Sequence, residues 1–367
     1  MTTRITGLRA LINKQKDNKT EFFDKFKKED GACRELIKAL HLLPQFMFNL
    51  RGDRVIIYYK CDKVLTVHKN GEIELTLSRV KKDSVLGDLF DNARKYAGTT
   101  VPLFDIDKNF NTKDKSEWLK LLLSMSAYMD EYNKGKNGVE KEIQQRIVLE
   151  NNLLGKSEAT DYFIIDTEYI AKTSKNDKVN NGKFDAMAVH YSEDTKLPQL
   201  AFIEVKAGND AVCGNQKESD KKQSGVYDHW FDVVKFSNIS DEFFKDKIEM
   251  LQELKELGFV KPDDKLNDCL AKKQIAMKPF QMIFVLANYD QSGAELIAEL
   301  EDIEKAQKGD FRKNDFSLEQ IKEFKENVKN IDLRFAVSSF MGYGLYDENM
   351  LTLEEFKKLL IKNTKGK

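Results

Sequence analysis

The segment Lys183–Gly208, KFDAMAVHYSEDTKLPQLAFIEVKAG, contains the pattern that decides the fold. Two runs of apolar and β-branched residues, Phe184–Tyr191 and Leu200–Ala207, predict two strands. The polar, proline-containing residues between them, Ser192–Pro198, predict a turn. Because a short turn joins the two runs, we expect an antiparallel hairpin.

Charged side chains interrupt this apolar hairpin at one end. Side chains alternate across a strand, so Glu204 and Lys206 share a face at the carboxyl end of their run. Antiparallel pairing then brings Asp185, near the start of the first run, close to Glu204. Buried charges of this kind carry a desolvation cost unless they have partners or water. The two carboxylates, the backbone carbonyl of Val205 and water form an oxygen site suited to Mg²⁺ or Mn²⁺.

Strand-like and helix-like segments alternate around the hairpin. Further strands are predicted at Tyr162–Ile170, Gln281–Ala287 and Leu333–Ser338, and helices near 139–153, 219–236, 241–257 and 294–306. This alternation predicts an α/β fold whose sheet is mixed in strand direction and covered on both faces. The charged C-terminal stretch Glu354–Lys367 is expected to form a solvated helix with a frayed end.

The first third of the chain has a different pattern. It contains a helix-like segment at 114–132 and three β-rich runs that predict an antiparallel meander, with Asn70-Gly71 as one turn: Arg54–Tyr59, Lys63–His68 and Glu72–Leu77. The polar stretch Asn133–Gly138 is the best linker candidate. We therefore expect a smaller N-terminal α+β domain at 1–135 and the α/β domain at 136–367. Substrate recognition, dimerisation and regulation all remain open as roles of the first domain.

Composition narrows the class of protein. The 367 residues include 60 Lys+Arg and 61 Asp+Glu, so the net charge is −1 and no overall basic field is available to hold a polyanion. The 4 Cys and 4 His lack the clustered spacing of a zinc site, so any metal is expected to be a hard one held by oxygen. No apolar run approaches the ~18–20 residues of a membrane span, and no signal-peptide pattern opens the sequence. We expect a cytoplasmic protein that does not enter a membrane.

The hairpin residues resemble the PD-(D/E)xK nuclease superfamily, which has a restriction-endonuclease-like fold. The family pattern is Asp, a variable gap and Glu-x-Lys on a hairpin within an αβββαβ core, and Asp185 with Glu204 and Lys206 matches it. Phe184 stands where the family often has Pro. The resemblance covers residues 139–290 and implies metal-dependent hydrolysis of phosphodiester bonds, with DNA favoured over RNA and 5′-phosphate products.

Other positions extend the resemblance. The exonuclease-type branch adds Gln-x-x-x-Tyr on the next helix, matched by Gln223 and Tyr227, which share a helix face although Gly225 weakens the helix between them. A Glu that the family often carries on the helix before the first core strand is matched by Glu142, with Glu140 as the alternative. By resemblance, Asp185, Glu204, Lys206, Gln223, Tyr227 and Glu142 are the catalytic candidates, and Asp185, Glu204 and the Val205 carbonyl are the metal ligands.

Several residues near this pattern have two interpretations. Asp166 and Glu168 are either extra acidic ligands or surface residues at a strand end. His229 and Trp230 either approach a phosphate or, as the default, pack between helix and sheet. The lysines of two loops either bind a nucleic-acid backbone or are only solvated: Lys172, Lys175, Lys178, Lys183, Lys221 and Lys222.

The expected partner follows from the resemblance alone. Nucleic acid, with DNA favoured, is the expected partner, and its affinity must come from a local basic surface, a homodimer or a partner subunit. Repair, restriction and antiviral defence all remain open as biological roles, and the last two are possibilities at the level of the family. Two rival classes are a catalytically inactive nucleic-acid-binding or sensor protein on the same fold, and an α/β interaction scaffold.

Overall fold

The chain divides into two compact units. The first holds Met1–Gly155 with Gln252–Lys261, and the second holds Lys156–Leu251 with Pro262–Lys367. The expected domain boundary near residue 135 stays a prediction. A computed structural model describes residues 26, 32–51, 54–68, 72–75, 100–102, 114–133, 139–152, 160–170, 183–208, 212, 225–236, 241–276, 279–287, 294–312, 316–337 and 342–365.

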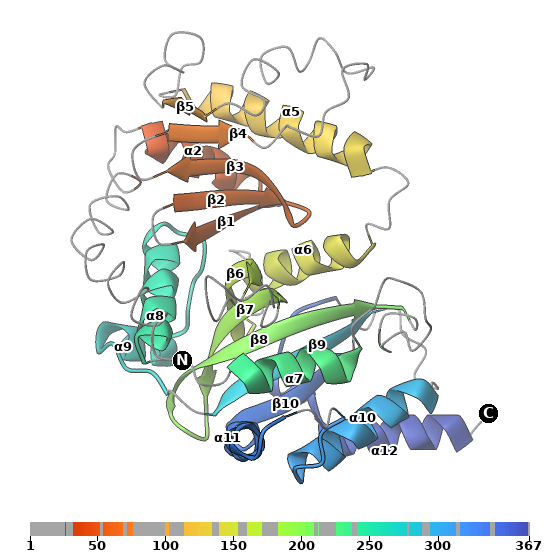
Figure 1. Cartoon of the computed structure of the whole chain (residues 1–367). Coiled ribbons are helices and arrows are strands. Elements are labelled where there is room, and N and C mark those ends of the chain that lie inside the picture. The colour runs from red at the N-terminus through yellow and green to blue at the C-terminus, as the bar shows by residue number, and fades with distance from the viewer. Residues whose placement is uncertain are drawn as a thin grey trace. The chain divides into compact units, whose positions relative to one another are not determined.

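The first unit contains a five-stranded antiparallel sheet in the order β1-β2-β3-β4-β5 (Figure 1). The structure adds two strands to the expected meander, the first and the last of this set: β1 (Phe46–Arg51), β2 (Arg54–Tyr59), β3 (Asp62–His68), β4 (Glu72–Leu75) and β5 (Thr100–Pro102). Lys60 and Cys61 join β2 to β3 with φ of 48° and 59°, as in a two-residue type I′ turn. The expected Asn70-Gly71 turn lies outside the described residues.

Three helices of the first unit are described: α2 (Ala32–Leu42), α5 (Lys115–Asn133) and α6 (Val139–Asn152). Trp118, Leu122 and Met125 of α5 recur at helical spacing and are buried, as the sequence predicts. The segment 252–261 joins this unit through Phe259, whose ring stacks on that of Phe48 at 4.7 Å between centroids.

The second unit is built on a six-stranded mixed sheet in the order β11-β10-β9-β8-β7-β6. The strands are β6 (Tyr162–Ile170), β7 (Lys183–Ser192), β8 (Leu197–Ala207), β9 (Phe280–Ala287), β10 (Ile331–Val337) and β11 (Leu351–Thr352). β6, β7 and β8 pair antiparallel, and β8, β9 and β10 pair parallel. The α/β class and the mixed sheet are therefore confirmed. β8 and β9 are buried along nearly their whole length, which explains their continuous apolar sequences.

Helices connect the parallel strands of this sheet, and one more helix follows its last strand. They are α7 (Val226–Phe236), α8 (Asp241–Glu256) and α9 (Asp264–Ala271) between β8 and β9, α10 (Ala294–Gln307) and α11 (Leu318–Val328) between β9 and β10, and α12 (Leu353–Lys365) at the end. In Figure 1, α7 lies across β8 and β9, while α10 and α12 lie side by side. No helix in the described part of the chain has the length and apolar character needed to span a membrane.

The C-terminal helix corrects one expectation. α12 is not a solvated helix, because Phe356 and Leu360 are fully buried. The ring of Phe356 stacks on Phe335 of β10, with centroids 4.5 Å apart, and Phe335 in turn stacks on Phe284 of β9. The sequence predicted a solvated helix because lysines and glutamates dominate its composition. The apolar residues recur at helical spacing, so they form one buried face.

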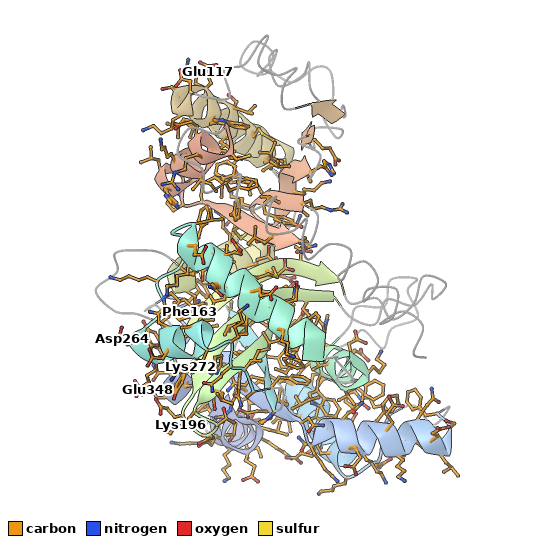
Figure 2. All side chains as sticks on the ribbon, turned by 90° about the vertical axis from the view of Figure 1, so that its left-hand side faces the viewer. Glu117, Phe163, Lys196, Asp264, Lys272 and Glu348 are labelled. Carbon is orange, nitrogen blue, oxygen red and sulfur yellow. The ribbon has the colours of Figure 1, made fainter. Side chains whose placement is uncertain are left out.

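The tip of the β7–β8 hairpin is shorter than predicted, since β8 begins at Leu197. The N–H of Lys196 donates to the Ser192 carbonyl at 2.9 Å, and the positive φ of Lys196, 56°, closes the turn. Lys265 of α9 pairs with Glu193 at the tip. Figure 2 shows Lys196 on the same side of the unit as Lys272, the residue that follows α9. The tip of the hairpin therefore contacts α9. The charged side chains Asp185, Glu204 and Lys206 lie at the opposite end of the hairpin.

Candidate active site

The register of β7 and β8 places the two predicted carboxylates opposite one another. Regular pairing ends at Ala186 and Ile203, so Asp185 falls across from Glu204. Beyond that pair the cross-strand bond is made by a side chain, because Asp185 Oδ2 accepts the N–H of Val205 at 2.8 Å. The carboxylates of Asp185 and Glu204 come from neighbouring strands and are both almost completely buried, at 5% and 3% exposed.

Lys206 completes this group from the same face of β8. Its Nζ donates to Glu204 Oε1 at 2.9 Å, and Lys206 is only 6% exposed. A pair so deeply buried has lost its hydration, and its attraction must offset that cost through close geometry and additional hydrogen bonds. This pair therefore differs from a surface ion pair, which contributes ~0–1 kcal/mol.

His229 of α7 provides a further polar contact for both members of the pair. Its Nε2 lies 3.0 Å from Lys206 Nζ, and its Nδ1 lies 3.1 Å from Glu204 Oε1. The sequence left two interpretations of this histidine, with packing between helix and sheet as the default. The structure places it at that interface and also against the predicted site residues. Together, Asp185, Glu204, Lys206 and His229 form what we call the hairpin site.

Tyr227 faces a different set of partners. Its ring lies under the guanidinium of Arg312, 4.3 Å from ring centroid to Cζ, and its hydroxyl oxygen accepts the Arg312 N–H at 3.1 Å. Its own N–H donates to Glu299 Oε2 of α10 at 2.9 Å. Burial raises the pKa of the Tyr227 hydroxyl, while Arg312 partly opposes that shift. These contacts make Tyr227 an anchor of α7, and its predicted role beside the hairpin site stays a prediction.

The remaining candidates belong to the other compact unit or lie outside the described residues, and their predicted roles stay predictions. Glu142 belongs to the first unit, where its half-exposed carboxylate pairs with Lys60 at 3.2 Å. Glu140 also lies on α6 of that unit. The side chains of Gln223 and of the six loop lysines lie outside the described residues: Lys172, Lys175, Lys178, Lys183, Lys221 and Lys222.

Asp166 and Glu168 occupy the neighbouring strand β6. Asp166 is buried, and its Oδ2 lies 3.8 Å from Nζ of Lys247 on α8. The interpretation of Asp166 as a surface residue is therefore wrong. Glu168 is partly exposed and has a positive φ of 53°, a conformation that costs a non-glycine residue about 1–2 kcal/mol. The register between Thr167–Ala186 and Tyr169–Phe184 puts Glu168 across from Asp185.

Two side chains that contact Tyr227 of α7 were given no role by the sequence. Glu299 and Arg312 are joined by an ion pair of 2.6 Å and hold the start of α7 through Tyr227. Both lie more than 70 residues along the chain from Tyr227, so no local pattern predicts the contact. The position of His229 follows from the buried residues Val226, Trp230 and Val233, whose i, i+4, i+7 spacing marks the sheet-facing side of α7.

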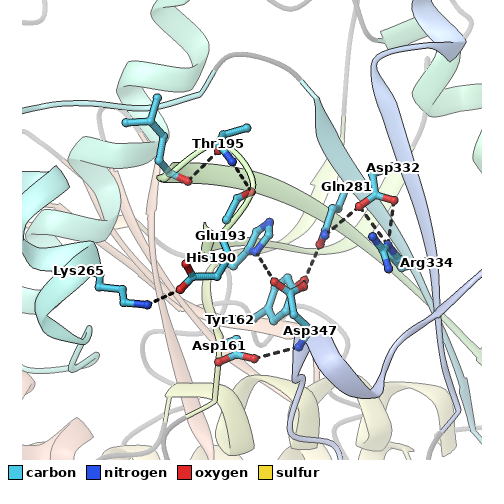
Figure 3. Close-up of polar contacts among 12 residues, drawn as sticks. Asp161, Tyr162, His190, Glu193, Thr195, Lys265, Gln281, Asp332, Arg334 and Asp347 are labelled. Carbon is cyan, nitrogen blue, oxygen red and sulfur yellow. Dashed lines mark hydrogen bonds and ion pairs between the residues drawn. The ribbon is translucent and has the colours of Figure 1, made fainter.

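A second polar cluster lies on the opposite face of the same sheet, toward the hairpin tip (Figure 3). His190 lies an odd number of positions after Asp185 on β7, so their side chains point to opposite faces. The ring of His190 stacks on Tyr162, and the single O–H of Tyr162 lies within hydrogen-bonding distance of two acceptors, Gln281 Oε1 at 2.5 Å and Asp347. Burial would raise the pKa of Asp347, but His190 and Tyr162 lower it below its usual value. This cluster fastens the segment around Asp347 to the sheet.

The hairpin site fits a hard divalent cation by the chemistry of its donors. Asp185 and Glu204 supply carboxylate oxygens from adjacent strands, and oxygen is the ligand type that Mg²⁺ and Mn²⁺ prefer. Among the described residues, no group of three or more His, Cys, Asp or Glu side chains is arranged to hold a metal ion. Mg²⁺ commonly binds through one or two carboxylates and keeps water and substrate oxygens as its other ligands, which agrees with a two-carboxylate site.

Comparisons with known proteins add no further evidence. No family model, no curated protein and no solved structure matches the chain.

Proposed function

We propose that the chain is a metal-dependent nuclease that hydrolyses phosphodiester bonds. The observation that carries the proposal is the grouping of Asp185, Glu204 and Lys206, three buried ionisable side chains from two adjacent strands in the register that the sequence predicts. The resemblance of these residues to the PD-(D/E)xK superfamily supports the same reaction. The order of elements, α6, β6, β7, β8, α7 and β9, with α8 and α9 inserted between α7 and β9, supports a restriction-endonuclease-like αβββαβ core.

Each residue of the hairpin site has a role in this proposal. Asp185 and Glu204 would hold one or two Mg²⁺ or Mn²⁺ ions, with the carbonyl of Val205 as an additional ligand. When bound, such a cation stabilises negative charge on the phosphate and lowers the pKa of the attacking water. The Lys206 ammonium orients that water or neutralises charge on the phosphate oxygens. The N–H of Val205 fixes the Asp185 carboxylate by their 2.8 Å bond.

Substrate binding needs charge that the whole chain does not supply. The net charge of −1 gives no long-range attraction for nucleic acid, so we propose that the loop lysines named above, a homodimer or a partner subunit supplies the affinity. DNA is the favoured substrate, and we expect products with 5′-phosphate ends.

The proposal is tested by incubating the purified protein with linear, circular and single-stranded DNA and with RNA. Each substrate is tested in EDTA, Mg²⁺ and Mn²⁺, and the products are mapped on a gel. We expect cleavage only with metal, and a loss of at least about 100-fold in rate for Asp185→Ala and for Lys206→Ala, as for removal of one charged transition-state group. Lys196→Ala, at the exposed hairpin tip, is the matched lysine control and should cut like the parent.

The other outcomes separate the rival functions. Metal-independent binding without cleavage under every condition would instead support the nucleic-acid-binding or sensor protein. Neither binding nor cleavage would support an α/β scaffold. Cleavage that survives in both Asp185→Ala and Lys206→Ala would place the activity outside the hairpin site and end the proposal.

A further inference from the structure

Helix α7 places one histidine ring between two of the proposed catalytic side chains. Nε2 of His229 lies 3.0 Å from Lys206 Nζ, and Nδ1 on the other side of the ring lies 3.1 Å from Glu204 Oε1. The His229 side chain is 17% exposed, and the two partners are more deeply buried. Glu204, Lys206 and His229 therefore form a closed triangle, with each side chain near the other two.

The chemistry of the lysine decides which nitrogen of the ring carries a proton. An ammonium group has three donors and no acceptor, so a hydrogen bond from Lys206 requires Nε2 of His229 to accept. A neutral imidazole that accepts at Nε2 carries its hydrogen on Nδ1, which is the nitrogen close to the Glu204 carboxylate. Acceptance of the Lys206 hydrogen bond at Nε2 therefore selects the Nδ1–H tautomer of the ring.

We propose that His229 is a positioning residue for Lys206, an inference that rests on the proposed nuclease function. Glu204 is both the partner of Lys206 and a proposed cation ligand, so it cannot serve both groups equally when a cation is bound. His229 offers the ammonium an acceptor that is not a ligand candidate in that site. With a cation bound, His229 would keep Lys206 directed at the phosphate by accepting from its ammonium, while Glu204 would serve as a cation ligand.

Contacts on both sides of His229 fix the position of α7. Tyr227, two residues before His229, is bonded through its N–H to Glu299 and through its hydroxyl to the N–H of Arg312. Trp230, the next residue after His229, is buried. A ring held on a helix anchored at both sides fixes its partner better than a ring on a loop does.

The first test reads the tautomer and needs no cleavage. The four histidines of the chain allow ¹⁵N-histidine NMR of metal-free protein, with the His229 signals assigned by their loss in His229→Gln. We expect His229 in the Nδ1–H tautomer. In Lys206→Met, which removes the donor but keeps the stem, the population should shift toward Nε2–H. An Nε2–H tautomer in the parent, or a tautomer unaffected by Lys206→Met, overturns the proposal.

The second test uses a pair of conservative variants. His229→Gln can keep an acceptor where Nε2 lies, whereas His229→Asn keeps a polar group near Nδ1 but cannot reach Lys206. We expect cleavage by His229→Asn to fall about 10–100-fold and His229→Gln to recover most of that loss, as for groups that orient a catalytic residue. Mn²⁺ affinity by calorimetry should be retained in both. His68→Asn and His68→Gln, in the first unit, serve as controls.

The outcomes separate this inference from the nuclease proposal. If the parent cuts nothing, the nuclease function fails, and the NMR result still decides whether His229 holds Lys206. If the parent cuts and His229→Gln and His229→Asn lose activity equally, the acceptor at Nε2 has no special role and the positioning proposal fails. Loss of Mn²⁺ binding in both variants would make His229 a part of the metal site instead.

Discussion

The bond from Val205 to Asp185 gives one carboxylate two tasks. Val205 is fully buried, so its N–H needs a partner, and Asp185 Oδ2 provides it at 2.8 Å just where the backbone pairing of β7 and β8 ends. The same carboxylate lies across from Glu204, which places two negative charges in a buried site. Asp185 therefore supports the hydrogen bonding of the sheet and destabilises it by repulsion at the same time.

Two substitutions of Asp185 separate these effects. In metal-free buffer we expect Asp185→Asn to raise the melting temperature, because the amide oxygen still accepts the Val205 N–H and the repulsion from Glu204 is removed. We expect Asp185→Ala to lower the free energy of unfolding by about 1–3 kcal/mol, because it leaves the buried Val205 N–H unpaired. Thermal and urea unfolding in EDTA measure both. A melting temperature for Asp185→Asn at or below that of the parent would contradict the repulsion argument.

Residues of the hairpin site differ in how far the sequence predicts them. Alternation along two strands is enough to place Asp185, Glu204 and Lys206 together, because strand periodicity and hairpin pairing are local rules. His229 requires the phase of α7 relative to the sheet, which depends on where the helix begins. The sequence predicted a start near residue 219, whereas the described helix begins at Val226. Residues 213–224, with Gln223, lie outside the described part, so the Gln-x-x-x-Tyr arrangement stays a prediction.

At the scale of elements, α7 is positioned by a carboxylate from another helix. Glu299 of α10 accepts the Tyr227 N–H in the first turn of α7, where unpaired N–H groups and the helix dipole favour a negative charge. Arg312 holds Glu299 at 2.6 Å and also pairs with Asp302. The buried carboxylate is thus compensated on both sides, by a helix terminus and by a guanidinium.

This arrangement predicts strong coupling between Glu299 and Arg312. We expect Glu299→Gln to lower the free energy of unfolding by about 1.5–3 kcal/mol, because charge-assisted bonds to a buried group are lost. Arg312→Gln should have an effect of similar sign, and a double-mutant cycle in urea should give a coupling energy of about 0.5–3 kcal/mol. Lys329→Gln, which removes an exposed ion pair with Glu326 at the end of α11, is the control and should change stability by less than about 0.5 kcal/mol. Additive effects of the two variants would show that the ion pair does not hold α7.

Elements with strong local patterns were predicted, and elements that depend on distant partners were not. The strands around the hairpin site follow from β-branched, apolar runs between turn residues. β5 has three residues and β11 two, so each forms only because a neighbouring strand offers it a ladder. The burial of α12 likewise depends on Phe335, which the sequence does not connect to Phe356.

At the scale of the whole molecule, the division into two compact units depends on contacts between residues that are far apart in the sequence. The expected linker at Asn133–Gly138 came from composition, yet α6 beyond it makes contacts in the first unit: Lys141 pairs with Asp62 at 2.7 Å. Phe259 joins the same unit although it follows β8 in the chain. Such contacts link residues about 80 and about 210 positions apart, beyond the reach of periodicity or turn signals.

Each unit contains a buried tyrosine bonded to a carboxylate. The Tyr59 hydroxyl donates to Asp130 at 2.9 Å in the first unit, and burial together with that bond raises the pKa of Tyr59 to about 12. In the second unit, burial and Asp347 raise the pKa of Tyr162 as well. An unfolded tyrosine ionises near pH 10, so above that pH the unfolded chain loses protons that the folded chain keeps.

The whole molecule should therefore lose stability as the pH rises above 10. The contribution of each tyrosine is fully present below pH 10 and is lost between pH 10 and about 12 for Tyr59, with a slope of at most about 1.4 kcal/mol per pH unit for one group. Urea unfolding from pH 8 to 11.5 should show a shallower decline for Tyr59→Phe and for Tyr162→Phe. Asp130→Asn should show a partial effect, because it removes one cause of the raised pKa of Tyr59.

Since the two tyrosines share no partner, their changes in slope should add in the double variant. If the free energy of unfolding falls with pH as steeply in all four variants as in the parent, neither hydroxyl is protected from ionisation by the folded chain.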